Sequence, residues 1–129
     1  LWRDSNATWY VWQSSSNSPV SLQFGASGDK PVPGDYDGDM KTDHAVWKAN
    51  HTWSIRYSST GNTSALSSFG YQNSDTEVQG DYDSDGKTDR AIWRPSDGYW
   101  YIEKSSTLTW RIQQWGQPGD IPVPAPYRR

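Results

Sequence analysis

The sequence predicts an all-β protein built from repeated units of four short antiparallel strands. Three observations support this: an Asp-rich motif that occurs twice, 46 residues apart; runs in which aromatic or β-branched residues alternate with polar ones; and clusters of Ser, Asn, Gly and Asp between those runs. Four strands in about 46 residues is the size of one β-propeller blade. No sustained 3.6-residue period is present, so we expect no helices.

The repeat predicts the order of the strands within a unit. The first strand is expected around Pro31–Pro33, and the second at Ala45–Trp47, just after the Asp-rich motif. The third is expected at Trp53–Tyr57, where Trp, Ile and Tyr alternate with Ser and Arg. The fourth leads into Phe69-Gly70. The chain is poor in aliphatic residues but has nine Trp and eight Tyr, so we expect large rings to fill the core.

The chain holds nearly three such units. We expect a single β-propeller segment over 1–129, with units at approximately 1–27, 28–72 and 73–118 and a C-terminal strand in 119–129 that completes a blade. The chain opens in a second strand and closes after a first strand, so two chains together would complete a ring. The expected partner is a second copy, in a six-bladed homodimer; the alternative is a portion of a longer propeller.

The repeated Asp-rich motif is the strongest chemical signal. Asp occupies positions 1, 3, 5 and 9 of both copies, and position 7 is a lysine whose peptide carbonyl is a further oxygen ligand. Ca²⁺ takes six to eight hard oxygen ligands, and carboxylates this close repel one another without a cation. We therefore predict about two Ca²⁺ per chain; the alternative is a solvated turn without metal. The predicted ligands are Asp35, Asp37, Asp39, Lys41 and Asp43 in the first loop, and Asp81, Asp83, Asp85, Lys87 and Asp89 in the second.

Position 6 of the motif distinguishes the two copies. This position usually has a positive φ, which Gly86 tolerates and Met40 does not. We therefore expect a weaker or strained metal site in the first loop. A third copy has lost the motif, because Ala-Pro-Tyr-Arg at 125–128 stands where Gly-Asp-Tyr-Asp is expected.

Composition excludes several classes of function. The formal net charge is −3, with no basic excess for nucleic-acid binding. No apolar run approaches the roughly 20 residues that cross a bilayer, so we expect no membrane insertion. The absence of Cys excludes a disulfide framework, a thiolate metal site and a Cys nucleophile.

The motif Gly-Asp-Tyr-Asp-x-Asp-x-Lys-Thr-Asp followed by Ala-(Val/Ile)-Trp resembles the FG-GAP/VCBS repeat family over essentially the whole chain. Such repeats form propeller blades in integrin α-chain heads and some fungal lectins. The resemblance implies an extracellular protein, secreted or on the cell surface, that Ca²⁺ stabilises and that serves adhesion or ligand binding. It points to the same eight aspartates. Family members recognise sugars, bind proteins or accompany enzymes, so the fold alone does not choose among them.

We expect non-catalytic recognition of a carbohydrate or a cell-surface protein. The chain has two His and two Glu, in no arrangement that suggests an acid–base pair or an activated nucleophile, so we do not expect an enzyme. Trp12 and Trp110 lack aromatic counterparts in the other units, which makes them candidate ligand-binding residues, with ordinary packing as the alternative. The alternative function is a purely structural repeat segment that supports an adjoining enzyme or adhesin domain.

Overall fold

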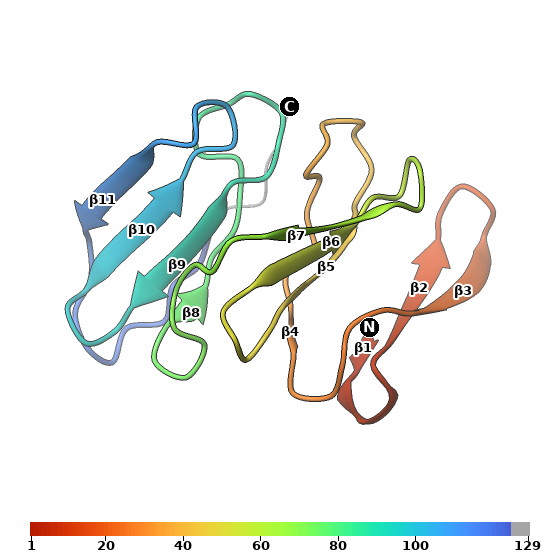
Figure 1. The fold of residues 1–129 in the computed structure, drawn as a ribbon, viewed down its shortest axis with the longest axis horizontal. Helices are drawn as coiled ribbons and strands as arrows, with labels where there is room; N and C mark the ends of the chain where they lie inside the picture. The colour runs from red at the N-terminus through yellow and green to blue at the C-terminus, as the bar shows by residue number, and fades with distance from the viewer. Residues whose placement is uncertain (125–129) are drawn as a thin grey trace.

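The structure, a computed structural model that describes residues 1–124, consists of three antiparallel β-sheets lying side by side (Figure 1). Each sheet is a simple meander, in the orders β1-β2-β3, β4-β5-β6-β7 and β8-β9-β10-β11. The all-β, antiparallel prediction is confirmed. Over residues 1–124 the sheets do not close into a ring or a barrel, so the propeller stays a prediction.

The strands are short, as the spacing of the turn residues predicts. The first sheet holds β1 (Trp2–Arg3), β2 (Thr8–Gln13) and β3 (Ser18–Gln23). The second holds β4 (Lys30–Pro31), β5 (His44–Trp47), β6 (Trp53–Arg56) and β7 (Thr63–Leu66). The third holds β8 (Thr76–Glu77), β9 (Arg90–Arg94), β10 (Tyr99–Glu103) and β11 (Trp110–Gln114).

Two tryptophans of each unit lie opposite one another on adjacent strands. The opposed pairs are Trp2 and Trp9, Trp47 and Trp53, and Trp93 and Trp100. Because side chains alternate between the two faces of a strand, one matched pair aligns the rest of the unit. The register therefore assigns each strand residue a counterpart in the neighbouring sheet.

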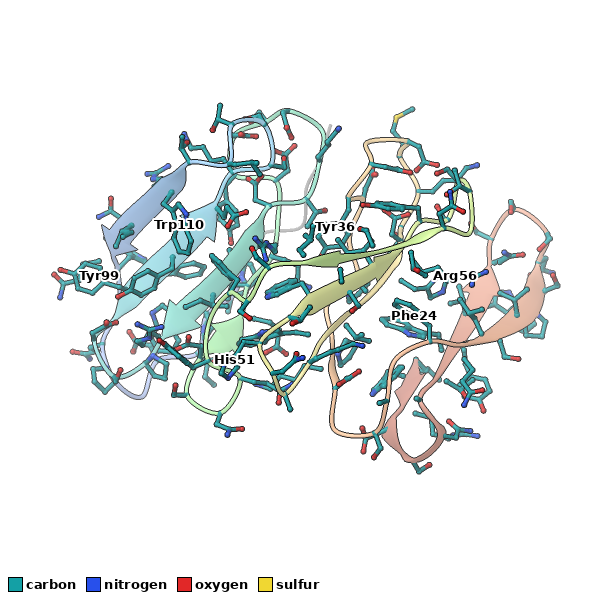
Figure 2. The ribbon with its side chains drawn as sticks, in the orientation of Figure 1. Phe24, Tyr36, His51, Arg56, Tyr99 and Trp110 are labelled. Atoms are coloured by element: carbon teal, nitrogen blue, oxygen red, sulfur yellow. The ribbon has the colours of Figure 1, made fainter. Side chains whose placement is uncertain are left out.

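The core lies mainly in the second and third sheets. β5 and β9 are buried along nearly their whole length, whereas every residue of β11 is exposed. Trp47 and Trp53 are fully buried, and their ring centroids are 5.7 Å apart. Burial of a large apolar side chain is worth roughly 1.5–3 kcal/mol, so rings supply much of the stability that aliphatic residues give elsewhere. Phe24 lies between the first and second sheets (Figure 2).

A turn glycine marks the joint between neighbouring sheets. Gly70 has a φ of +77°, and a Cβ there would lie 2.9 Å from Trp47 of its own sheet and 3.0 Å from Ile92 of the next. A Cβ at Gly25 would lie 3.0 Å from Val46 in the same way. We call this arrangement the inter-sheet joint: a turn glycine between the tryptophan of its own sheet and an aliphatic residue of the next. Both the left-handed backbone and the close approach require glycine here.

Two expectations are corrected by the structure. Asp4–Asn6 forms a single turn of 3₁₀ helix, too short to give a periodic signal. Pro122–Pro124, expected as a first strand, pairs with no strand within residues 1–124, and Val123 is 85% exposed. The rest of the expected C-terminal strand, 125–129, lies outside the described residues. Among the residues described, no helix is long and apolar enough to cross a membrane.

Candidate metal centres

Each Asp-rich loop connects the first and second strands of a sheet. The first loop runs from β4 to β5 and the second from β8 to β9, and both lie at the upper edge of the molecule in Figure 1. β4 ends at Pro31, and β8, which has no proline, ends at the equivalent Glu77. The isolated bridges between Gly34 and Asp43 and between Gly80 and Asp89 then close the base of each loop.

The structure brings the first three aspartates of each loop together. One carboxylate oxygen from each member lies within 4.8 Å of the others. The two triads are Asp35, Asp37 and Asp39, and Asp81, Asp83 and Asp85. A pair of unit charges at this separation repels by roughly 1 kcal/mol in water and by several at the lower effective dielectric of a protein surface. Three carboxylates in one loop are a hard-oxygen donor set that fits a divalent cation such as Ca²⁺.

The first aspartate is held by the loop backbone. The Asp35 carboxylate accepts hydrogen bonds from the N–H groups of Gly38 at 2.7 Å, Asp39 at 3.2 Å and Met40 at 2.8 Å. In the second loop, Asp81 accepts the N–H groups of Asp85 and Gly86, at 3.2 Å and 2.9 Å. These bonds form the turn locally and aim the later carboxylates at the same point.

Lys41 and Lys87 were expected to contribute their carbonyl oxygens. The structure shows what their N–H groups do: each donates to the aspartate two residues earlier, Asp39 at 2.9 Å and Asp85 at 2.8 Å. This bond orients the peptide between positions 6 and 7 of the motif, whereas the lysine carbonyl belongs to the next peptide.

The last aspartate of each loop lies outside the triad and is fully buried. Asp43 accepts the N–H groups of Tyr36 at 2.9 Å and Ser58 at 2.8 Å, which ties the loop to the turn after β6. Asp89 is bonded in the same way, and burial raises the pKa of its carboxyl. Burial, followed by the charge of Asp89, also raises the pKa of Tyr82 to about 12. The structure therefore assigns this position an anchoring role in addition to any metal contact.

Serine hydroxyls reach the triads from a neighbouring turn, a contribution that the sequence reasoning missed. Ser59 donates to Asp37 at 2.6 Å, and this bond lowers the pKa of the Asp37 carboxyl. In the third sheet, Ser105 donates to Asp85 at 2.9 Å and Ser106 donates to Asp83. A signal was present in the sequence, because a Ser-Ser pair follows the third strand in both units.

The backbone is left-handed at positions 4 and 6 of both loops. Met40 has a φ of 67° and its counterpart Gly86 has 85°, so the expected strain at Met40 is present. At position 4 the residues are reversed: Gly38 has a φ of 83° and Ser84 has 62°. Each loop therefore holds one glycine and one strained residue. Backbone strain therefore does not distinguish the two loops. The weaker metal binding expected in the first loop stays a prediction.

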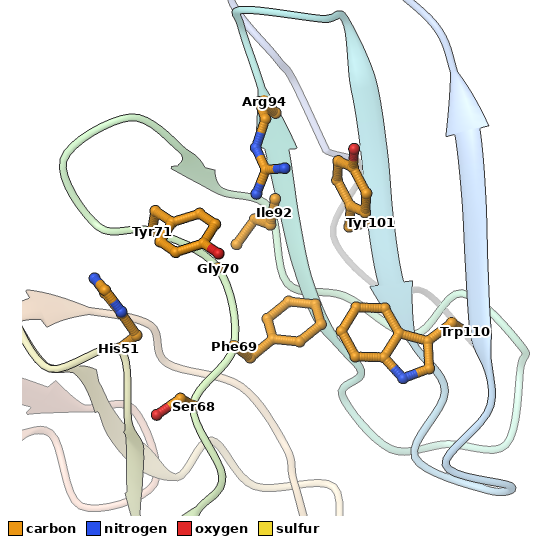
Figure 3. A pocket seen from close by; sticks show the side chains of 9 residues that line it. All are labelled: His51, Ser68, Phe69, Gly70, Tyr71, Ile92, Arg94, Tyr101 and Trp110. Carbon is orange, nitrogen blue, oxygen red and sulfur yellow. The ribbon is translucent and has the colours of Figure 1, made fainter.

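The two candidate ligand-binding tryptophans lie in different settings. Trp12 is 65% exposed on β2, near the exposed Val11 and Val20, and its indole N–H donates to Asn17 at 3.1 Å. Trp110 is 54% exposed at the start of β11, and its ring lies 4.9 Å from that of Phe69 (Figure 2). Trp12 lines a pocket together with Lys41 of the first Asp-rich loop and His44 of the second sheet, whereas Trp110 belongs to the boundary between the second and third sheets (Figure 3).

The remaining ionisable candidates have structural contacts. His44 packs edge-on against Trp9, with ring centroids 5.2 Å apart, and His51 packs on Tyr71 at 5.3 Å. Glu103 forms an ion pair with Arg90 at 2.7 Å. The aspartates outside the metal loops accept hydrogen bonds from turn N–H groups; they are Asp4, Asp29, Asp75, Asp97 and Asp120.

Comparisons with protein-family models, with curated proteins and with solved structures found no match.

Proposed function

We propose that this chain is a Ca²⁺-stabilised β-propeller segment of the FG-GAP/VCBS type that serves non-catalytic recognition outside the cell. The observation that carries the proposal is the duplication of the acidic triad: in both sheets three aspartates come together, the N–H at position 6 donates to position 1, and a serine from a neighbouring turn donates to position 3. A solvated turn has no reason to repeat this arrangement. The proposal implies a Ca²⁺ affinity in the 10⁻⁴–10⁻³ M range of extracellular modules.

The first experiment tests the metal. Thermal unfolding is followed with CaCl₂, with MgCl₂ and with EDTA. Ca²⁺ should raise Tm and EDTA should lower it, because a ligand that binds only the folded state stabilises it. The double variant Asp37→Asn/Asp83→Asn should lose this response, whereas Glu77→Gln, which removes a carboxylate outside the loops, should keep it. A wild-type Tm that is the same in EDTA and in CaCl₂ would contradict the proposal.

The second experiment tests recognition. A glycan array is probed with the protein in CaCl₂ and in EDTA, and saturable binding that chelation abolishes is the expected result. The competing candidate is a structural repeat segment that supports an adjoining enzyme or adhesin domain. Ca²⁺-dependent stability without any binding to glycans or to cell surfaces would favour that candidate.

We also propose that the end sheets join a second copy of the chain. Leu1 is 94% exposed and is the counterpart of Val46 and Ile92, the aliphatic members of the inter-sheet joints. At the other end, Gly116 packs on Trp93 of its own sheet without an aliphatic partner from a further sheet within residues 1–124. The two ends are thus complementary halves of one joint, as a six-bladed homodimer needs. Sedimentation velocity should show a dimer at micromolar concentration, and a monomer at all concentrations would contradict this assembly.

A further inference from the structure

The lysine at position 7 of the second metal loop lies against the first metal loop. Gly38 belongs to the first loop, and a Cβ built on it would lie 3.2 Å from Cγ and 3.3 Å from Cε of Lys87. The next residue of the second loop, Thr88, donates its N–H to the Asp35 carbonyl at 2.7 Å. The Lys87 side chain therefore follows the first loop from its stem almost to its charged end.

This contact lies between two of the aspartates that form the first triad. Gly38 is flanked in the chain by Asp37 and Asp39, and both of these belong to the triad. Cε of Lys87 carries the ammonium group, so a residue of the second loop holds a positive charge beside the first site. Within residues 1–124 Lys87 forms no ion pair, so no direct carboxylate contact neutralises this charge.

The equivalent lysine of the first loop has a different neighbour. Lys41 lines a pocket together with Trp12 and Gln13 of β2, in the first sheet. In the part of the chain that the structure describes, the first sheet has no Asp-rich loop. Lys41 therefore lies beside a sheet without a candidate metal site, whereas Lys87 lies beside a sheet that has one.

Position 4 of the motif differs between the loops in a way that fits this contact. Both loops have a left-handed backbone there, and Ser84 shows that the second loop accepts a side chain at that position. At Gly38 a Cβ would approach the Lys87 stem more closely than an ordinary van der Waals contact allows. The backbone alone therefore does not require glycine at position 38, but the lysine of the other loop favours it.

We propose that the charge of Lys87 lowers the Ca²⁺ affinity of the first loop. The proposal rests on the Ca²⁺ binding proposed above and concerns the regulation of one of its sites. A cation held beside a site for a divalent cation opposes binding there. Because Lys87 is exposed, water and salt screen the repulsion, so its expected size is about two- to fivefold in affinity. Lys87 acts on the first site through its charge and not as a ligand.

The test measures each site separately in the whole chain. Asp83→Asn disables the second loop so that the first is measured, and Asp37→Asn does the reverse. The dependence of Tm on CaCl₂ concentration then gives the Kd of the remaining site. Lys87→Met keeps the stem and removes the charge, whereas Lys87→Arg keeps the charge. We expect Lys87→Met to tighten Ca²⁺ binding at the first site by about two- to fivefold, with a smaller effect at the second, and Lys87→Arg to leave the first site unchanged.

Three comparisons separate this effect from net charge and from packing. Lys48→Met removes a lysine at the end of β5 that lies away from the loop, and it should leave the Kd of the first site unchanged. Lys41→Met should change the first site less than Lys87→Met does, although Lys41 belongs to that loop. The effect of Lys87→Met should also shrink between about 0.1 M and about 1 M KCl, because the Debye length falls from roughly 10 Å to roughly 3 Å.

The outcomes distinguish this inference from the metal proposal. Ca²⁺ binding at the first site with the same Kd before and after Lys87→Met would overturn the role of Lys87 and keep the metal proposal. Equal effects of Lys87→Met and Lys87→Arg, an effect that 1 M KCl leaves unchanged, or a larger effect at the second site would also overturn it. A wild-type Tm that does not respond to CaCl₂ would contradict both proposals, and the Tm of each variant in EDTA shows whether the fold is kept.

Discussion

At the scale of single residues, the metal loops place two non-glycine residues in the left-handed region. Such a conformation costs an L-residue roughly 1–2 kcal/mol, and glycine avoids most of that cost. Met40 and Ser84 carry it in the first and second loop, at φ 67° and 62°. Because the counterpart of each is a glycine in the other loop, the chain itself shows that glycine fits both positions.

We expect Met40→Gly to tighten Ca²⁺ binding in the first loop and Ser84→Gly to tighten it in the second. Relief of about 1 kcal/mol of strain corresponds to roughly a fivefold increase in Ca²⁺ affinity. The greater conformational freedom of glycine offsets part of this increase. Isothermal titration with CaCl₂ measures both. Gly61→Ser is the control for a left-handed turn away from the loops, and it should change stability without changing affinity. Equal affinities in Met40→Gly and wild type would show that strain does not limit the first site.

A second residue-scale prediction concerns pH. His44 lies on β5 opposite Arg56, and burial, helped by the Arg56 charge, lowers its pKa below the usual 6.5. The folded protein therefore favours the neutral ring, and the unfolded chain binds the proton more readily. Stability should fall as the pH drops below about 6.5 and should be level above it. Urea unfolding at pH 7.5 and 5.5 in excess CaCl₂ measures this, and His44→Gln should flatten the difference; a stability that rises toward pH 5.5 would contradict it.

The sequence predicts that the aspartates of each loop lie close together, but it does not predict the residues that support them. Spacing identifies Asp35, Asp37 and Asp39 because ligands in one short loop are close in sequence. Ser59 comes from a turn more than twenty residues later, so only the packing of β6 against the loop reveals it. The pairing of Arg94 with Asp75 is hidden for the same reason: it joins two strand ends that no local pattern relates.

At the scale of elements, the inter-sheet joint is the most constrained feature of the fold. Gly70 sits between Trp47 and Ile92, so an added methyl group must displace the core. Gly61 also has a positive φ, of 73°, but an added Cβ would meet only the end of Arg56, at 3.5 Å. The two glycines share the backbone requirement and differ in packing.

We expect Gly70→Ala to destabilise the protein by about 1–3 kcal/mol more than Gly61→Ala, because both substitutions strain the backbone and only the first overpacks the joint. Urea unfolding of the two variants gives the difference directly. Equal losses of stability would mean that the second and third sheets can move apart at little cost.

The elements themselves were predictable to different degrees. The second and third strands of each unit lie where the sequence predicts them, because the repeated aromatic and β-branched residues mark these strands in each unit. The first strands are shorter than expected, at two residues each, because the chain turns into the Asp-rich loop soon after each of them. At Pro122–Pro124 the sequence matches a first strand, but a strand also needs an edge to pair with.

At the scale of the whole molecule, stability is distributed unevenly. The strands of the second sheet and β9 carry three buried tryptophans, Trp47, Trp53 and Trp93, whereas the hairpin of β2 and β3 buries only Trp9 and is otherwise largely exposed. We expect amide hydrogens of β5, β6 and β9 to exchange slowest, and those of β11 and of the β2–β3 hairpin to exchange fastest among the strands. Hydrogen exchange followed by mass spectrometry measures this order. Dimer formation should slow exchange in both end sheets, and uniform protection across the three sheets in a monomer would contradict the expected gradient.

The two metal loops touch each other. The Thr88 N–H in the second loop donates to the Asp35 carbonyl of the first at 2.7 Å, and Thr88 packs against Gly34. Ordering one loop therefore lowers the conformational cost of ordering its neighbour. In a longer row of such sheets, Ca²⁺ binding to one unit would favour binding to the next. The occupancy of the sites would then rise more steeply with Ca²⁺ concentration than independent sites allow.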